Sequence, residues 1–283
     1  MIISVASGKG GTGKTTVSTN LALSIENVQF IDCDVEEPNA NIFLKAKIDN
    51  SKPISVSHPN IDKSKCDYCG KCSDFCAYNA IAVVPKNIIV FPELCHSCGG
   101  CELICPNEAV NWNNRVIGKV EHGQAKGIDF YQGLLNVGEM QAIPVIKALK
   151  RKIDKNKNVI IDVPPGTSCP VIESIVGSNY CILVTEPTPF GLYDLKLAVE
   201  VVRHLKIPFG VIINRDGIGD NKVEYYCQKE NIPVLLKVPD RRKIAYLYSK
   251  GIALASKSTE WHEMFGLVYN QIQEEVKKSN SLQ

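Results

Sequence analysis

Two runs of four cysteines constrain this chain more strongly than any other feature of its sequence. Eight of its 12 cysteines fall between residues 66 and 105. The first run is Cys66, Cys69, Cys72 and Cys76, and the second repeats its spacing 29 residues later as Cys95, Cys98, Cys101 and Cys105. A chain of 283 residues can bury a full core without disulfides. Thiols clustered at a repeated spacing therefore favour a duplicated metal-binding module.

The spacing C-x2-C-x2-C-x3-C, followed by Pro106 in the second run, is similar to that of the bacterial two-cluster ferredoxins. Three closely spaced thiolates wrap one face of a cubane, while the fourth points to the other cubane. The expected ligands of one [4Fe–4S] cluster are Cys66, Cys69, Cys72 and Cys105, and those of the other are Cys76, Cys95, Cys98 and Cys101. A zinc site uses paired C-x2-C knuckles, which does not account for four cysteines in each run.

A glycine-rich segment near the start of the chain predicts a phosphate-binding loop. Residues 8–15, GKGGTGKT, fit the pattern G-x-x-x-x-G-K-[ST]. They follow an apolar strand expected over 2–6 and precede residues with helical spacing, which is the context that the motif requires. Glycines let backbone N–H groups converge on phosphate oxygens, Lys14 would reach the β- and γ-phosphates, and Thr15 would ligate Mg²⁺. The competing interpretation is a glycine-rich turn with a chance lysine and threonine.

The longer run SGKGGTGKTT resembles the deviant Walker A loop of the MinD/ParA/Mrp superfamily, also called the SIMIBI class. Two further segments match that family. FIDCD at 30–34 looks like its first switch, and VIIDVPPG at 159–166 looks like Walker B with the second switch. The resemblance implies an ATPase that forms a homodimer with nucleotide at the interface, where Lys9 reaches the partner's nucleotide. A solvated loop lysine is the competing interpretation of Lys9.

The same resemblance assigns roles around the nucleotide. Asp34 would position the attacking water, with a turn or N-cap aspartate as the alternative, and Asp32 and Asp162 would act with Thr15 at Mg²⁺. The Gly166 N–H would face the γ-phosphate. The expected catalytic residues are Lys9, Lys14 and Asp34. The expected nucleotide-binding residues are Gly8, Lys9, Gly10, Gly11, Thr12, Gly13, Lys14, Thr15, Thr16, Gly166, Asn214, Arg215, Pro239 and Asp240. The last four belong to the segments that the resemblance places at the adenine.

Outside the cysteine region, the chain alternates apolar strands with amphipathic helices. Strands are predicted over 2–6, 28–31, 115–121, 128–135, 159–163, 181–185, 210–213 and 234–237, and helices over 140–153, 170–177, 191–205, 220–230, 241–250 and 260–278. This alternation predicts an α/β fold with a doubly wound, mostly parallel sheet. A P-loop ATPase domain is expected over 1–60 and 113–283, interrupted by a ferredoxin-like insert at 61–112. Prolines are expected to break 35–60, and the polar tail after Val276 is expected to fray.

Four cysteines lie outside the two runs. Cys181 is predicted in the core and Cys33 pointing inward, with Cys227 half-buried on a helix. Cys169 follows Asp162 by seven residues, a spacing at which the nitrogenase iron protein, a distant member of the superfamily, has a cluster-ligating cysteine. That similarity implies an additional cluster or an interface role for Cys169, and a packed thiol at a helix start is the alternative. The C-x-x-C pair of the Mrp-type cluster carriers is not found after residue 112.

The charge and hydropathy of the chain limit its partners. With 32 basic and 30 acidic residues, it lacks the basic excess expected of a general nucleic-acid binder. We expect no signal peptide, because Met1 leads straight into a strand. Apolar runs fall short of the roughly 20 residues that span a bilayer. A cytoplasmic protein without membrane attachment is therefore expected.

Three functions are compatible with these features. The first is an ATP-switched iron–sulfur protein that acts on a protein client in cluster or metallocofactor assembly. The second is an ATP-gated, low-potential electron donor for a redox partner, similar in logic to the nitrogenase iron protein. The third is a positioning protein of the MinD/ParA kind with redox-sensing clusters. The third would use a terminal amphipathic helix on a membrane, whereas the apolar face of 260–278 favours core packing.

Overall fold

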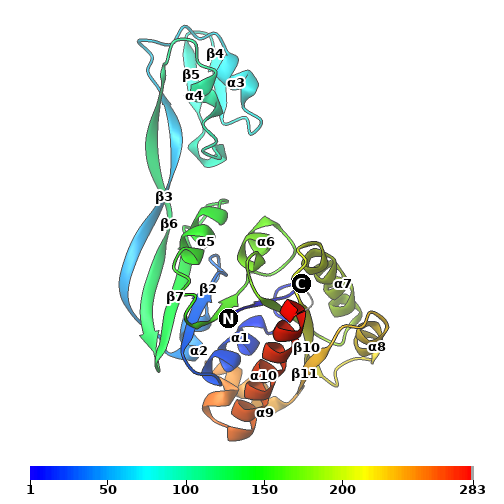
Figure 1. Cartoon of the computed structure of the whole chain (residues 1–283). Helices are drawn as coiled ribbons and strands as arrows, with labels where there is room; N and C mark the ends of the chain where they lie inside the picture. Colours follow the sequence, from blue (N-terminus) through cyan, green and yellow to red (C-terminus); the bar gives the residue numbers. More distant parts are fainter. Residues whose placement is uncertain (282–283) are drawn as a thin grey trace.

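A mixed β-sheet forms the centre of the computed structural model, which describes residues 1–281 (Figure 1). Within them the sheet has nine strands in the order β11-β10-β9-β1-β8-β2-β7-β6-β3. The parallel strands are β11 (Val234–Pro239), β10 (Phe209–Asp216), β9 (Tyr180–Thr185), β1 (Ile2–Ala6), β8 (Asn158–Asp162), β2 (Val28–Asp32) and β7 (Ile128–Leu135). At one edge, β6 (Val110–Ala125) and β3 (Lys47–Ile61) run antiparallel. The expected α/β fold with a mostly parallel sheet is confirmed.

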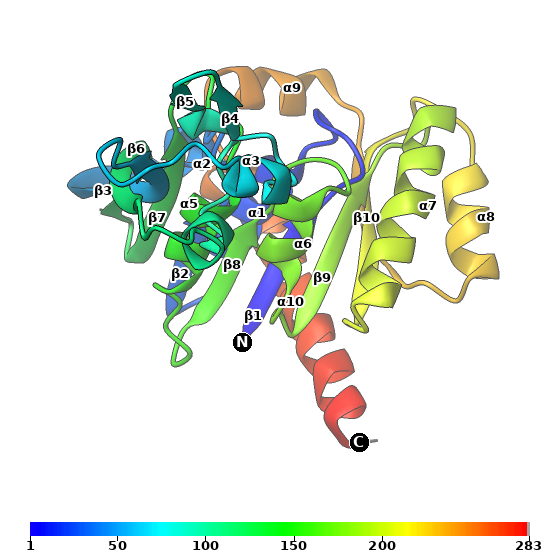
Figure 2. The same ribbon diagram turned by 90° about the horizontal axis from the view of Figure 1, so that it is seen from above.

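Helices cover both faces of the sheet (Figure 2). One face packs against α5 (Ile143–Lys150), α6 (Cys169–Ile175), α7 (Pro189–His204) and α8 (Lys222–Lys229). The other packs against α1 (Lys14–Leu23), α2 (Ala40–Leu44), α9 (Arg242–Ser249) and α10 (Thr259–Ser281). Alternate side chains of a strand enter opposite cores: Ile161 faces the first helical layer and Ile160 the second. This two-sided burial explains why the parallel strands are apolar throughout.

The antiparallel edge extends into a twisted ribbon that carries a small separate unit (Figure 1). The strands β3 and β6 pair from Lys47↔Gln124 to Ile61↔Val110. Residues 62–109, here called the head, contain α3 (Lys71–Phe75), β4 (Ile81–Val84), β5 (Asn87–Val90), the 3-10 turn Pro92–Leu94 and α4 (Gly100–Leu103). The head has its own small apolar core around Ile81, Ile88 and Val110. The cysteine runs thus lie on a unit that projects from the main sheet.

Two local expectations were wrong. The segment 35–60 is not broken by its prolines, because Pro53 and Pro59 lie inside the long strand β3. That strand is at the edge of the sheet, where a proline can turn its missing N–H outward without losing a ladder hydrogen bond. The tail did not fray after Val276, because α10 continues to Ser281. The last two positions of the expected tail lie outside the described residues.

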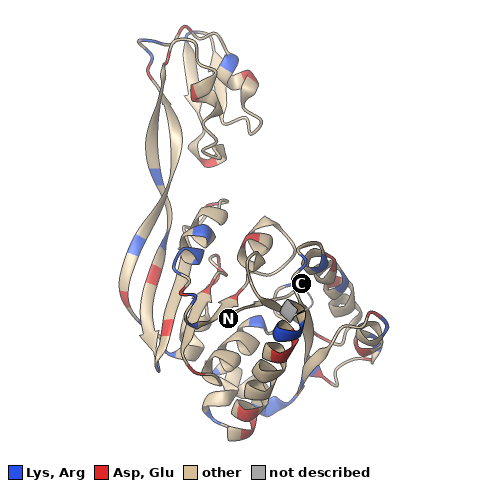
Figure 3. Cartoon of the chain, viewed as in Figure 1, with Lys and Arg blue, Asp and Glu red and all other residues tan. Residues whose placement is uncertain are grey.

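The helix α10 packs as a core helix. Phe265, Val268 and Ile272 are buried in the second core, with Trp261 and Val276 partly buried against it, as the apolar spacing predicted. Among residues 1–281, no helix is both long and apolar enough to cross a bilayer. Figure 3 shows residues of both charge signs interspersed over the surface of the sheet-and-helix body.

Candidate functional site

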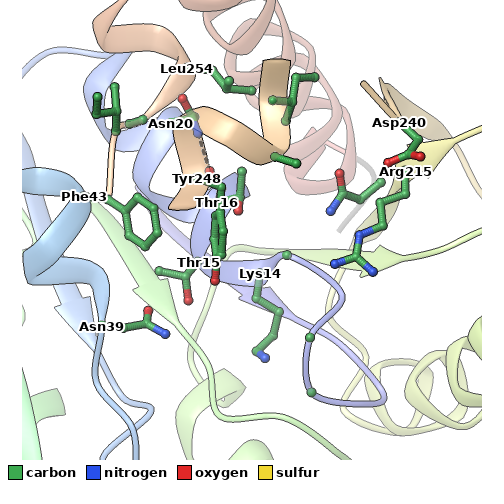
Figure 4. A pocket seen from close by; sticks show the side chains of 18 of the residues that line it. Lys14, Thr15, Thr16, Asn20, Asn39, Phe43, Arg215, Asp240, Tyr248 and Leu254 are labelled. Atoms are coloured by element: carbon green, nitrogen blue, oxygen red, sulfur yellow. Dashed lines mark hydrogen bonds between the residues drawn. The ribbon is translucent and has the colours of Figure 1, made fainter. Parts of the chain in front are cut away.

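A cavity of about 340 Å³ lies at the carboxyl ends of the parallel strands, beside the glycine-rich loop (Figure 4). The cavity is lined by most of the residues predicted to bind nucleotide and by Asp34, which was predicted to be catalytic. The predicted nucleotide-binding residues in the lining are Gly10, Gly11, Gly13, Lys14, Thr15, Thr16, Asn214, Arg215, Pro239 and Asp240. Together with Asp34 they come from four places in the chain that the strand order brings together. This position, outside the carboxyl edge of a parallel sheet, is where α/β folds bind ligands.

The loop before α1 adopts a conformation that depends on glycine. Gly11 and Gly13 have φ of 78° and 95°, in a region that other residues rarely enter. The Asn214 side chain donates to the Thr12 carbonyl over 2.8 Å and ties the loop to β10. A Cβ on Gly13 would stand 2.3 Å from the same amide nitrogen. The loop therefore presents its backbone N–H groups and the N-terminus of α1 to the cavity, an arrangement suited to phosphate.

The three residues expected at Mg²⁺ lie together beneath this loop. Asp32 and Asp162 are buried, and neither carboxylate oxygen of Asp162 has a hydrogen-bond partner of good geometry among the described residues. Burial raises the pKa of Asp162 to about 7, against the lowering influence of the Thr15 hydroxyl and the Lys14 ammonium. Burial and the charge of Asp162 also raise the pKa of Asp32. Buried oxygens without partners beside a hydroxyl fit a hard divalent cation.

Asp34 faces the nucleotide cavity from the end of β2. Burial raises its pKa to about 6, opposed by the Lys14 ammonium. The Asp34 backbone N–H donates to Asp32 Oδ1 over 3.1 Å, so the turn that carries Asp34 is fixed by the neighbouring carboxylate. The Asp34 side chain remains partly exposed, and it is therefore accessible to a water molecule in the cavity.

Lys9 and Arg215 share one buried acid that sequence reasoning missed. Glu186 follows β9 and is 6% exposed. Its carboxylate pairs with Lys9 Nζ at 3.5 Å and with the Arg215 guanidinium at 2.8 Å. Lys9 is not among the residues that line the cavity, and a third of its side chain is exposed. Nothing in the local sequence around Glu186 marks it, because the contact depends on the packing of β9 beside β1.

Four residues predicted to bind nucleotide lie outside the cavity lining: Gly8, Lys9, Thr12 and Gly166. The Gly166 N–H donates to the Ser7 carbonyl over 3.0 Å, so it does not face the cavity as expected. Gly8 packs against α7, where a Cβ would stand 2.2 Å from the Asp194 carbonyl oxygen. In this arrangement Gly8 supports the loop from behind, and Gly166 joins the second switch segment to the loop.

Several lining residues have no motif that could have predicted them. Phe43 of α2 and Tyr248 of α9 form an aromatic pair with ring centroids 5.0 Å apart, and both line the cavity. Asn20 and Asn39 also line it. Figure 4 shows Phe43 and Tyr248 among the side chains that line the cavity. These residues extend the cavity beyond the phosphate loop and give it an apolar wall.

The eight clustered cysteines surround two cavities in the head. One is lined by Cys66, Cys69, Cys72 and Cys105, and the other by Cys76, Cys95, Cys98 and Cys101. Each set combines three thiols of one run with the fourth of the other, which is the grouping that the spacing predicted. The repeat also appears in the backbone: the Ala80 and Ala109 N–H groups donate to Cys76 and Cys105 sulfur, each over 3.3 Å.

The donors fit iron–sulfur clusters, and the two cavities differ in size. Four thiols in each set match the ligand type of such clusters. The cavity of the second set measures about 160 Å³. That of the first measures about 20 Å³. Among residues 1–281, no group of three or more His, Cys, Asp or Glu side chains is placed to hold a single metal ion.

The four remaining cysteines have different environments. Cys33 and Cys181 are fully buried, as expected. Cys227 is also fully buried, rather than half-buried, because α8 turns it into the first core. Cys169 is the first residue of α6 and is exposed, so the alternative of a packed thiol is wrong, although its place at a helix start is correct.

Comparisons with known proteins agree with this geometry. A family model described as the CobQ/CobB/MinD/ParA nucleotide binding domain matches residues 3–254. An uncharacterized protein of Methanocaldococcus jannaschii is 32% identical over 89% of this chain and 90% of its own length. An iron–sulfur cluster carrier protein of Rickettsia bellii is 27% identical over 89% of this chain and 65% of its own length. The structure of the septum site-determining protein MinD of Pyrococcus horikoshii with Mg-ADP is similar in fold, with a TM-score of 0.56 and 21% identity, covering 94% of this chain and 93% of that one.

Proposed function

This chain belongs to the CobQ/CobB/MinD/ParA nucleotide-binding domain family, and on that premise we propose that it is an ATPase that acts in iron–sulfur cluster or metallocofactor assembly. One observation carries the proposal: a phosphate-loop cavity and two four-thiol cavities occur in the same chain. A relative named as an iron–sulfur cluster carrier supports the same function. The chain has no C-x-x-C after residue 112, so the clusters would be held by the head.

In the proposed ATPase reaction, the loop N–H groups and Lys14 hold the phosphates, and Asp34 orients the attacking water. Thr15, Asp32 and Asp162 would hold Mg²⁺, which neutralises charge on the transferred phosphoryl group when bound. A pKa of about 6 keeps Asp34 largely ionised at neutral pH, so its carboxylate accepts a hydrogen bond from the water. Asn214, Pro239 and Asp240 would lie beside the adenine base of the nucleotide.

Lys9 supports a nucleotide-dependent homodimer. Its ammonium is paired with Glu186, and Lys9 does not line the cavity of its own chain. Since that ion pair is partly exposed, it is worth at most about 1 kcal/mol. ATP between two copies would provide a stronger anionic partner for the same lysine. Hydrolysis would remove that partner and release the dimer.

Electron donation is a second candidate, favoured by the burial of two thiols of the second set. Cys95 and Cys101 are 7% and 8% exposed, which limits the access of a competing thiol from a client. A cluster retained in this way would pass electrons instead of being transferred. The redox chemistry would then belong to the clusters, and the chain would control docking.

Iron content tests the thiol assignment. Anaerobically reconstituted protein is expected to hold about eight iron atoms per chain. Cys105→Ser should halve that number in the same way as Cys66→Ser, because both remove ligands of one set. Cys169→Ser is the matched control, an exposed cysteine outside both cavities, and should retain all the iron. Loss of cluster signals of both sets in the Cys105→Ser chain would contradict the crossed arrangement.

A transfer assay separates the two functions. The reconstituted protein is mixed with Mg-ATP and either an apo iron–sulfur client or a redox acceptor, and cluster content is followed in both partners. ATP-dependent loss of clusters to the client supports assembly. Reduction of the acceptor with all clusters retained supports electron donation. If Mg-ATP changes neither rate, both functions are wrong.

A further inference from the structure

The segment that joins β7 to α5, residues 136–142 and here called the arm, contacts the second cysteine run. Gln141 Nε2 donates to the Cys95 carbonyl over 2.8 Å and lies 3.5 Å from the Glu93 carbonyl. Cys95 is one of the thiols of the larger cavity. The arm therefore contacts the backbone of a proposed cluster ligand directly.

A buried ion pair fixes the same region. The Glu139 carboxylate, 5% exposed, binds the Arg115 guanidinium of β6, and Arg115 Nη2 also donates to the Pro92 carbonyl over 3.4 Å. The Met140 N–H donates to Glu139 over 3.1 Å, which holds the carboxylate within the arm. Burial raises the pKa of Glu139, but the hydrogen bonds and charge of Arg115, together with backbone N–H groups of the arm, outweigh burial and lower it. The pair is therefore ionised at neutral pH.

Just before the arm, the end of β7 meets the segment that follows the proposed first switch. The Leu135 N–H donates to the Val35 carbonyl over 2.8 Å, and Val35 follows Asp34 in the chain. The packing is close at this point, because a Cβ on Gly133 would stand 2.6 Å from Val35 Cγ1 and 2.9 Å from Val145. A displacement of Val35 cannot be absorbed by free space and must move the end of β7.

These contacts form a continuous path from the nucleotide cavity to one of the two thiol sets. We propose that the arm couples the state of the nucleotide to the second thiol set, with Gln141 and Glu139 as positioning residues. The proposal rests on the proposed function for the presence of nucleotide and clusters. Among residues 1–281, the hydrogen bonds of the arm with the head go to residues 93–95 and none goes to the first run. The coupling is therefore asymmetric.

Hydrogen exchange tests this coupling in the holoprotein with Mg-ADP and with a non-hydrolysable ATP analogue. Exchange at residues 93–97 and 136–142 is expected to differ between the two nucleotides, with little difference at 66–72. Gln141→Ala should reduce the difference at 93–97 about fivefold, as expected for the loss of one hydrogen bond. Gln271→Ala removes an exposed glutamine on α10 and should leave the response intact.

A second variant tests the coupling independently of any local misfolding in the Gln141→Ala chain. Glu139→Gln preserves the shape of the side chain and removes its charge, and it should also weaken the response at 93–97 while nucleotide affinity stays unchanged. Arg203→Gln, which breaks the exposed pair with Glu230, is its control. In the Cys69→Ser chain, which keeps the second set, the EPR spectrum of the dithionite-reduced cluster should change with nucleotide, and Gln141→Ala should remove that change.

The outcomes distinguish this coupling from the proposed function. Slower exchange at residues 8–16 with nucleotide reports binding at the phosphate loop, and its absence would overturn both the function and the coupling. Slower exchange there with no change at 93–97 would overturn the coupling alone. An equal response at 66–72 and 93–97, or a full response in both the Gln141→Ala and Glu139→Gln chains, would also overturn it.

Discussion

Replacing Gly13 by alanine tests how the phosphate loop is held before any nucleotide is present. The backbone φ of 95° strains an L-residue at this position, which costs about 1–2 kcal/mol. The new Cβ would also stand 2.3 Å from Asn214 Nδ2. Displacing that amide breaks its hydrogen bond to the Thr12 carbonyl, worth about 1 kcal/mol. We therefore expect the free energy of unfolding to fall by about 2–3 kcal/mol.

Gly11→Ala is the matched control for this substitution. Gly11 has a φ of 78°, but a Cβ there meets nothing within 4 Å, so only the backbone strain of about 1–2 kcal/mol applies. Urea unfolding of both variants without nucleotide measures the difference. In a chain that also carries Asn214→Ala, the cost of Gly13→Ala should shrink by about 1 kcal/mol, because the clash and the hydrogen bond are both gone. Equal costs at the two glycines, or strict additivity in the double variant, would refute this reasoning.

Three further substitutions have defined outcomes. Lys9→Ala should change the unfolding free energy by less than about 1 kcal/mol, since its pair with Glu186 is partly exposed, yet abolish ATP-dependent dimers in light scattering. Tyr180→Phe removes a buried hydroxyl that donates to Glu275 over 2.5 Å and should cost about 1–3 kcal/mol in urea unfolding. Burial raises the pKa of Asp129, but hydrogen bonds from Lys157 and other groups outweigh burial and lower it. The ionised Asp129 carboxylate therefore stabilises the folded chain above about pH 4, and this contribution is lost at lower pH. Asp129→Asn should therefore destabilise the chain at pH 7 and much less at pH 3, and an equal loss at both would count against the assignment.

The sequence predicted the elements whose side chains repeat with a single period. The parallel strands and the long helices match their predicted ranges within a few residues, because both depend on local apolar spacing. The strand β3 was missed because Pro53 and Pro59 are strand breakers in most contexts. Only the order of strands in the sheet shows that β3 is an edge, and strand order is a long-range property.

The same division applies to the candidate site. The phosphate loop and the grouping of the eight thiols follow from short motifs, since each motif contains the atoms that would meet the proposed ligand. Glu186, Tyr248 and Gln141 could not be predicted, because each reaches its place through contacts between segments distant in sequence. The Gly166 prediction was wrong for the same reason, as its N–H bonds to Ser7, directly after the strand β1.

The paired ends of the ribbon have a consequence for the entropy of the chain. Ile61 lies opposite Val110, and the Asp62 N–H donates to the Ala109 carbonyl over 2.8 Å. In the folding of the sheet, the whole head therefore counts as one loop, whose two ends are joined by paired residues of the neighbouring strands β3 and β6. The entropic penalty of closing such a loop grows only with the logarithm of its length, about 0.6 kcal/mol for each doubling. The sheet can thus carry a head twice as long, or half as long, at almost the same cost in stability.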